Sequence, residues 1–409
     1  PILLTAMEHS VQDAMPGSMT NTGFFLSGGT DTGAVVALAA RSVKTPVKTF
    51  TIGYEGTGAG YEDYNEFHYA RLIAEHYGTE HHEFHISPDS LKSALPRIIA
   101  GLKQPSGDAI NTFLVSGTLP GEIDTVLTGT GGDEIFIGSH WFRQQARLME
   151  TSAKWQKLPG FMRSLVLGTT SVLPGALGYR FKRLNELGNG VQAQYRHFKF
   201  MFSGHDTNTL FTADFRDQLS SRYSPESIVD MYDDPILNYD PVNQMENLLF
   251  KHEVSNLQLR DVDAMSIVHG MEARSPLVDR RILDVLCRVS GEGKAPGLQL
   301  RHLMFKTLGE LLLEKTKTRP KMSFIVPMDL WARRDLKPMI TQLLSPEVVA
   351  RRGIFNPEVI QKISHDYFVS GRERHPFKVW NLALLELWCR FHVDVKTGSA
   401  IPDRVEDLL

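Results

Sequence analysis

Residues 24–33, FFLSGGTDTG, pass from an apolar strand through a glycine-rich turn into a helix of small residues. Glycine lets the backbone approach a ligand closely, and the amides exposed in such a turn form a concavity for anions. The N-terminus of the following helix adds unpaired N–H groups and the positive end of its dipole. We therefore predict that Ser27, Gly28 and Gly29 form a pyrophosphate-binding turn.

A carboxylate, Asp31, lies at the rim of this turn. It would repel a bare phosphate, so its position predicts a divalent cation between the carboxylate and the phosphates. The pattern G-x-x-x-x-G-K-[ST] is absent from the chain, which excludes the usual kinase-type phosphate loop. The alternative interpretation is a glycine-rich turn that joins a strand to a helix and binds no ligand.

A second segment, residues 127–136, has the sequence LTGTGGDEIF and repeats the order of strand, glycine-rich turn and helix start. It again delivers a carboxylate, Asp133. An acid in a first helical turn stabilises its helix by ~0.3–1 kcal/mol, which would account for one such residue. Two such turns at one sheet edge are better explained by a Mg²⁺ ion that Asp31 and Asp133 share.

Up to about residue 145, short β-branched or aromatic runs alternate with helical patterns. This alternation predicts an α/β fold with a parallel sheet flanked by helices, whose ligands bind outside the carboxyl ends of the strands. The expected strands are residues 23–26, 49–52, 83–86 and 125–128, and the expected helices are residues 31–42, 62–77, 88–102 and 111–119.

From about residue 140 onward the periodicity is almost wholly helical. We expect a nucleotide-binding part over residues 1–145, a helical insert over 146–239 and a helical C-terminal part over 240–409. The clearest helical patterns of these two parts are residues 141–156, 191–202, 243–257 and 380–391.

Composition and charge are those of an ordinary globular protein, with 42% hydrophobic and 22% charged residues and a net charge of −3. No basic field supports a nucleic-acid partner. No apolar run reaches the ~18 residues of a membrane span, and no secretory signal is visible, so we expect a cytoplasmic location. Cys287 and Cys389 are expected to be buried thiols in a reducing compartment, with a single disulfide as the alternative.

Two further segments carry charge in unusual places. Residues 260–279 have too many charges for a plain core helix and too regular an apolar spacing for a loop. In residues 319–328, Lys321 lies between two prolines on a stiff segment, which suits a cation aimed at one point. By itself, a lysine in a loop is more often a solvated charge.

The order and spacing of these motifs resemble the synthetase domain of the glutamine-dependent asparagine synthetase family, a branch of the PP-loop ATP pyrophosphatases. The SGGTD, GTEHHE and GGDE segments are similar to those of bacterial members encoded with exopolysaccharide genes. The matching segments are residues 26–33, 49–53, 104–108, 128–138, 263–279 and 319–321, followed by Trp331.

The resemblance implies a PP-loop fold and a reaction that uses ATP and Mg²⁺. A carboxylate, aspartate or a related acid, would attack the α-phosphate to give an acyl-AMP and pyrophosphate, and ammonia or an amine would then displace AMP. Lys321 would stabilise the developing charge, and Asp31 and Asp133 would bind the metal. The resemblance places Leu26, Ser27, Gly28, Gly29, Asp31, Thr32, Ile52, Thr128 and Gly129 around ATP.

The chain departs from the family pattern at several positions. Thr130 stands where the family usually has an acid that positions the substrate or nucleophile, so we count it with Lys321 and Asp133 among the catalytic candidates. Ala264 replaces an arginine and Ile137 replaces a glycine. The alternative function is therefore a catalytically impaired scaffold or binding subunit in polysaccharide biosynthesis.

The family's glutaminase half uses an N-terminal cysteine, whereas the first cysteine here is Cys287. We expect ammonia from a glutaminase domain or subunit outside this chain, and a homodimer is left open. Residues 56–60 and the histidines of residues 81–85 allow weaker dinucleotide and zinc interpretations. Basic residues around the apolar segment 154–183 allow a membrane-surface interpretation, but we favour a buried helical hairpin and expect no membrane association.

Overall fold

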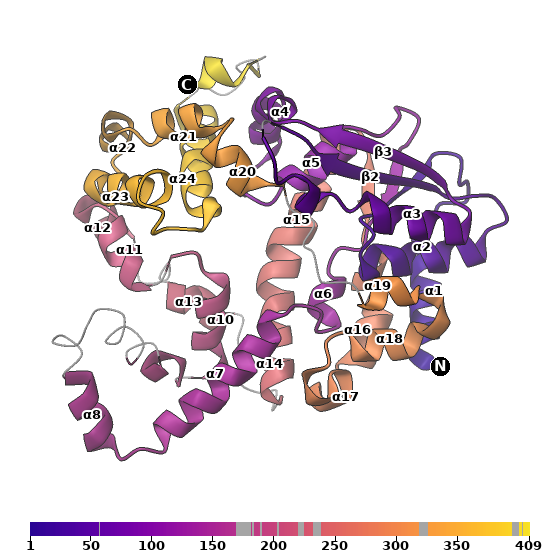
Figure 1. Ribbon diagram of the computed structural model, residues 1–409, viewed down its shortest axis with the longest axis horizontal. Coiled ribbons are helices and arrows are strands. Elements are labelled where there is room, and N and C mark those ends of the chain that lie inside the picture. The colour runs from indigo at the N-terminus through magenta and orange to yellow at the C-terminus, as the bar shows by residue number, and fades with distance from the viewer. Residues whose placement is uncertain are drawn as a thin grey trace.

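The computed structural model describes residues 1–56, 58–168, 181, 184–188, 190–202, 204–219, 225–231, 239–318, 326–394, 401–402 and 404–409. A sheet with its covering helices forms one side of the molecule, and the remaining helices extend away from it (Figure 1). The long helical segment of α14 (Pro241–Leu248) and α15 (Leu259–Ile267) lies between these two regions (Figure 1).

Within the described residues the sheet has five parallel strands in the order β3-β2-β1-β4-β5. The chain moves outward from β1 to β3 and then returns to the other side of β1, so the strand order reverses between β1 and β4. Ligands of such sheets bind at this reversal. The strands are β1 (Thr22–Phe25), β2 (Lys48–Tyr54), β3 (Glu80–Ile86), β4 (Thr125–Leu127) and β5 (Glu272–Arg274).

Helices cover both faces of the sheet, as expected for parallel strands that are buried on both sides (Figure 1). On one face, Phe24 and Leu26 share a core with α1 (Ile2–Ala14), α2 (Thr30–Ser42) and α3 (Phe67–Tyr77). On the other face, residues of β2 pack with helices from both ends of the chain. Of these, α5 (Ile110–Ser116) contacts β2, and α5 in turn packs against α4 (Pro88–Gly101) and α15.

Local sequence explains where several of these helices begin. Ser87 precedes Pro88 and accepts a hydrogen bond from the backbone of Ser90, which is a standard N-terminal cap of α4. Asp240 caps α14 by accepting from the backbone amides of Val242 and Asn243. Both caps satisfy amides that the helix itself leaves unpaired.

The C-terminal two thirds of the described chain are mainly helical. Residues 249–258 continue α14 as a π-helical segment into α15. The helices not yet given are α6 (Gly132–Ile135), α7 (Trp141–Gln156), α8 (Gly160–Gly168), α10 (Val191–Lys199), α11 (Gly204–Leu210), α12 (Ala213–Gln218), α13 (Pro225–Asp230), α16 (Arg280–Leu286), α17 (Gly291–Lys294), α18 (His302–Leu308), α19 (Glu314–Thr318), α20 (Met328–Arg333), α21 (Lys337–Leu343), α22 (Pro346–Arg352), α23 (Pro357–Phe368) and α24 (Pro376–Cys389).

The parallel α/β fold expected from the sequence is confirmed, and four details are corrected. Strand β5 lies in a region for which we expected almost wholly helical structure and no strand. The helix expected over residues 62–77 is a short 3-10 turn, Glu62–Tyr64, followed by α3. Cys287 is an exposed free thiol, whereas Cys389 is the expected buried one. The fourth correction concerns α8.

Helix α8 is not part of a buried hairpin, because the side chains of Phe161 and Leu165 are 74% and 69% exposed. It extends away from the rest of the molecule at the end of α7 (Figure 1). Residues 169–180, on which the hairpin prediction also depended, lie outside the described residues. In the part of the chain that the structure describes, no helix is both long and apolar enough to span a membrane.

Candidate functional site

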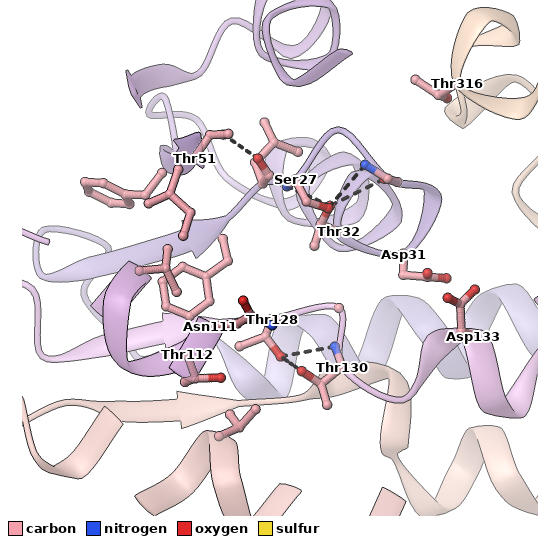
Figure 2. A pocket seen from close by; sticks show the side chains of 18 of the residues that line it. Ser27, Asp31, Thr32, Thr51, Asn111, Thr112, Thr128, Thr130, Asp133 and Thr316 are labelled. Carbon is pink, nitrogen blue, oxygen red and sulfur yellow. Dashed lines mark hydrogen bonds between the residues drawn. The ribbon is translucent and has the colours of Figure 1, made fainter. Parts of the chain in front are cut away.

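A cavity of about 270 Å³ lies at the carboxyl ends of β1, β2 and β4, at the reversal of strand order. Its walls combine polar residues of the two glycine-rich turns with apolar residues of the strands (Figure 2). Among the residues predicted from the sequence, the cavity is lined by Leu26, Ser27, Gly29, Asp31, Thr32, Ile52, Thr128, Gly129, Thr130 and Asp133.

Of the predicted residues that the structure describes, Gly28 does not line the cavity. Gly28 lies behind the first turn, where its φ of +72° and the backbone of α3 both require glycine. A Cβ atom at this position would lie 2.7 Å from the backbone nitrogen of Ala70. Gly28 therefore packs the turn against α3 instead of contacting the cavity. Lys321 lies outside the described residues.

Hydroxyl groups organise the first turn. Thr32 Oγ1 accepts a hydrogen bond of 3.2 Å from the backbone amide of Ser27, and Ser27 Oγ accepts one of 3.3 Å from the amide of Gly29. These distances are at the long end of the range for N–H···O bonds, so the bonds are weak. A phosphate oxygen is a stronger acceptor and could replace these hydroxyls at the same amides.

The second turn has its own hydroxyl cluster (Figure 2). Thr128 Oγ1 accepts from the backbone amide of Thr130 at 3.1 Å and donates to Thr130 Oγ1 at 2.8 Å. Ser275, which follows β5, places its hydroxyl 3.2 Å from the same Thr128 oxygen. The neutral Thr130 side chain is thus fixed by hydrogen bonds at the position where the family pattern predicts an acid.

The two turns touch each other through glycines. A Cβ atom at Gly129 would lie 2.6 Å from the backbone nitrogen of Thr32, and one at Gly132 would lie 2.6 Å from Asp31 Oδ1. Any larger residue at either position would push the turns apart. These glycines therefore serve a contact between two strand ends, in addition to leaving room for a ligand.

The carboxylates of Asp31 and Asp133 point toward each other from the two turns (Figure 2). A third side chain, Arg301, lies between them: its Nη2 donates to Asp31 Oδ2 at 3.1 Å and to Asp133 Oδ1. Burial lowers the pKa of Arg301, but the charges of the two carboxylates outweigh it, so the pKa is raised overall. The group is a compact ion-pair triad at the rim of the cavity.

The residue after Asp133 behaves differently. Glu134 is buried, and its side chain accepts a hydrogen bond of 3.1 Å from Gln258 Nε2. Burial, together with the charges of Asp133 and Glu253, raises the pKa of Glu134 to about 7. Glu134 does not line the cavity, so of these three carboxylates only Asp31 and Asp133 face it.

The inner wall of the cavity is apolar and suits a flat ring. Asn111 supplies a polar group beside it and also accepts a hydrogen bond of 3.0 Å from the backbone of Val326. This bond ties α5 to the chain that follows residues 319–325, which lie outside the described residues. The apolar lining residues are Phe25, Leu26, Phe50, Ile52, Val115 and Val262.

A second positively charged side chain, in addition to Arg301, borders the cavity and comes from α19. Lys317 lines the cavity, is 20% exposed and lies 3.3 Å from Glu314 Oε2, one helical turn earlier. Thr316 lines the same side, on an element separate from the two turns (Figure 2). The structure thus brings α19 to the site, and the segment that carries Lys321 follows it outside the described residues.

Sequence reasoning missed about half of the lining residues. Phe25 lies in the first glycine-rich segment, and Phe50 and Thr51 lie in a matching segment, but nothing there marks them as ligand contacts. Most of the others belong to no motif. Apolar residues on a strand carry no signal that separates a cavity wall from a core position. Arg301 follows an irregular stretch, and nothing in its neighbours predicts a contact with two aspartates far away in the chain. The missed lining residues are Phe25, Phe50, Thr51, Asn111, Thr112, Val115, Val262, Arg301, Thr316 and Lys317.

The donor set fits a metal that arrives with phosphates. Among the described residues, no three His, Cys, Asp or Glu side chains are grouped as a metal cage. Mg²⁺ is usually held by one or two carboxylates together with substrate phosphates and waters. Asp31 and Asp133 match that requirement, because an oxygen of each lies within hydrogen-bonding distance of the same atom, Arg301 Nη2.

Comparison with known proteins agrees with this geometry. The family model described as asparagine synthase matches residues 3–390. Asparagine synthetase [glutamine-hydrolyzing] 1 of Bacillus subtilis is 22% identical over 379 residues, 91% of this chain and 56% of the relative. A putative asparagine synthetase of Mycobacterium bovis is 27% identical over 335 residues, 81% of this chain and 48% of the relative. The chain spans about half the length of these curated relatives.

Proposed function

The chain belongs to the asparagine synthase family, and from that membership we propose that it is an ATP-dependent ligase that forms an amide. Its first substrate would be a small carboxylate, aspartate or a related acid. The carboxylate attacks the α-phosphate of ATP, forming an acyl-AMP and releasing pyrophosphate. Ammonia or an amine then attacks the acyl carbon, AMP leaves, and the nitrogen loses its proton.

The observation that carries this proposal is the convergence of Asp31 and Asp133 beside a cavity with an apolar inner wall. The wall suits adenine, and the amides of the first turn suit the phosphates. The two acids would hold Mg²⁺, which neutralises phosphate charge and assists the departure of pyrophosphate. Helix stabilisation accounts for each acid separately, but it does not by itself explain why two strand ends present an acid to one cavity.

The chain's own cations complete the site. Lys317 lines the cavity, and we propose that Lys321, four residues further along, reaches the reacting phosphate. A cation placed there is most effective on the charge that develops in the transition state. Lys321 is therefore proposed as catalytic, and Lys317 as a residue that supports nucleotide binding.

A second candidate function is supported by Thr130. Its hydroxyl is bound to Thr128, so this position offers neither a base nor a negative charge to an acceptor. A chain that binds nucleotide but transfers nothing, serving as a scaffold in polysaccharide assembly, is consistent with that neutral side chain. The two functions differ in whether any acid drives adenylation.

The decisive experiment is acid-dependent exchange of labelled pyrophosphate into ATP, screened over aspartate, uronic acids and other small carboxylates. The ligase proposal expects exchange with at least one acid and AMP, not ADP, as the nucleotide product. Formation of ADP and phosphate would overturn it. Exchange that no acid supports in the parent, but that appears in Thr130→Glu, would identify the impaired scaffold.

The nitrogen source follows from the extent of the match. Because the chain spans about half of its glutamine-hydrolysing relatives, we propose that ammonia comes from a glutaminase domain or subunit outside it. Ammonium salts should then replace glutamine in the full reaction. We also propose a cytoplasmic location, where ATP and Mg²⁺ are available.

A further inference from the structure

Arg301 is the least expected member of the site. One nitrogen atom, Nη2, contacts carboxylate oxygens of both Asp31 and Asp133. The side chain of Arg301 is 13% exposed, so the ion pairs are largely shielded from water. Removing one partner of a shielded ion pair leaves an uncompensated buried charge, which costs more than breaking an exposed salt bridge.

The backbone around Arg301 is held in a costly conformation. Arg301 has a φ of +57°, and Ile137, whose carbonyl accepts the Arg301 amide hydrogen bond of 3.3 Å, has a φ of +53°. The left-handed region is uncommon for residues other than glycine and unusual for a β-branched one. Such strain clusters at functional sites, where the surroundings impose it. Here it fixes the Arg301 side chain between the two turns.

The guanidinium has donors to spare. Arginine carries five N–H groups, and the two aspartates use those of Nη2 alone. Arg301 Nε is buried and has no hydrogen-bond partner among the described residues. Because Arg301 lines the cavity, its side chain borders the region where the phosphates are proposed to bind.

We propose that Arg301 and a divalent cation compete for Asp31 and Asp133, so that metal binds well only together with a nucleotide. This inference rests on the proposed function, which assigns the two acids to the metal. Free metal must break two shielded ion pairs and leave the guanidinium without a counter-ion. A metal–nucleotide complex offers the displaced guanidinium phosphate oxygens, which it binds in a fork geometry. Arg301 is thus a positioning residue that couples metal entry to nucleotide entry.

The test measures Mn²⁺ binding by electron paramagnetic resonance, without turnover. In the parent protein, Mn²⁺ should bind at least tenfold more tightly with a non-hydrolysable ATP analogue than without it. Arg301→Gln removes the competing charge, so Mn²⁺ should bind it at least tenfold more tightly than the parent when no nucleotide is added. The Asp31→Asn change placed in Arg301→Gln should remove that gain.

Two controls keep the experiment decisive. Arg143→Gln changes an exposed arginine that donates to Leu298 O near the same loop but does not contact the aspartates, so it should bind Mn²⁺ like the parent. Arg301→Lys retains the charge and should keep metal binding dependent on nucleotide. If Arg301→Gln does not fold, the parent still allows the inference to be refuted, because an unchanged Mn²⁺ affinity on adding the analogue would contradict it.

The inference is overturned if folded Arg301→Gln binds Mn²⁺ no better than the parent, or if the analogue does not change Mn²⁺ affinity of the parent. Its failure is distinguishable from failure of the ligase proposal. A gain of metal affinity in Arg301→Gln without exchange by any acid would support the inference and count against the ligase. Acid-dependent exchange without that gain would do the reverse.

Discussion

Both glycine-rich turns bring an aspartate to the cavity, but different parts of the chain hold them in place. The first, after β1, is supported by parts of the chain that follow it closely: Gly28 packs on α3, and Leu26 pairs with β2. The second, after β4, is supported from much further along the chain. Gly131 packs on Val278, Thr128 contacts Ser275, and Asp133 pairs with Arg301.

One turn is therefore held mainly by segments close to it in the chain, and the other mainly by distant ones. The first turn takes its shape from β1, α2, β2 and α3, although its Asp31 also pairs with Arg301. The second needs the chain to return after more than a hundred residues as β5 and α18. Damage to the C-terminal part should therefore reach the second turn before the first.

The largest effect should come from the acids that both turns deliver. Asp31→Asn and Asp133→Asn should each reduce acid-dependent exchange by on the order of 10² or more, because each weakens the metal site. Asp89→Asn is the matched control, since Asp89 is a first-turn acid of α4 with an exposed side chain. Unchanged exchange in both site variants would show that the acids only stabilise their helices.

The next effect distinguishes the packing contacts that hold the two turns in place. Gly28→Ala places a methyl group against the backbone of α3 at a positive φ, so it should lower the unfolding free energy by about 2–3 kcal/mol. Gly131→Ala meets Cγ2 of Val278 at 2.3 Å, and a Val278→Ala change in the same chain should restore part of the loss. Chemical denaturation measures both.

The control is Gly78→Ala, which has a φ of +62° and open space around its Cβ position. It should cost about 1 kcal/mol, the contribution of the backbone alone. The comparison fails if Gly28→Ala and Gly78→Ala lose the same stability.

A smaller effect should follow from removing one hydroxyl of each turn. Thr128 is 4% exposed, and its hydroxyl bonds to Thr130 and lies beside Ser275, so Thr128→Val should cost about 1–3 kcal/mol. Thr32 makes longer bonds in a more open place, and Thr32→Val should cost about 0.5–1.5 kcal/mol. Equal losses in urea unfolding would contradict the ranking.

The smallest effect concerns pH. Hydrogen bonds from Arg281, followed by the charge of that residue, hold the pKa of Asp279 below its usual range against the effect of burial. A group whose pKa is lower in the folded state stabilises the protein at pH values above its unfolded-state pKa, about 3.9 for aspartate. This stabilisation is lost as the pH falls through the folded-state pKa. Asp279→Asn should therefore cost about 1 kcal/mol at pH 7 and nothing at the acid limit.

The readout is urea unfolding of the parent and Asp279→Asn from pH 7 down to the acid limit of folding. Asp279 also caps α16, just after the segment that supports the second turn. Since asparagine keeps the capping oxygen, the variant isolates the charge. A stability difference that does not shrink below about pH 4 would exclude this assignment.

Sequence reasoning worked where a short segment determines its own structure. The strand, turn and helix around Asp31 were predicted within one or two residues, and α7 has the predicted bounds. In both cases the hydrophobic period and the glycines act over a few neighbouring residues. The parallel direction of the strands could also be predicted, because strands joined through helices can pair in few other ways.

Prediction failed where contacts with distant parts of the chain determine the local structure. Strand β5 has three residues and no period of its own, and it forms because β4 offers it an open edge. The apolar residues of α8 suggested burial, but the folded chain leaves them without a covering element among the described residues.

By itself, the sequence determined the parallel α/β class, the two glycine-rich turns and the acids that they carry, because glycine conformation and hydrophobic period are local properties. Only the tertiary structure decided that Gly129 and Gly132 let the turns touch, and that Arg301 lies between Asp31 and Asp133. A contact between residues about a hundred or more positions apart depends on how the whole chain packs, and no local pattern encodes it.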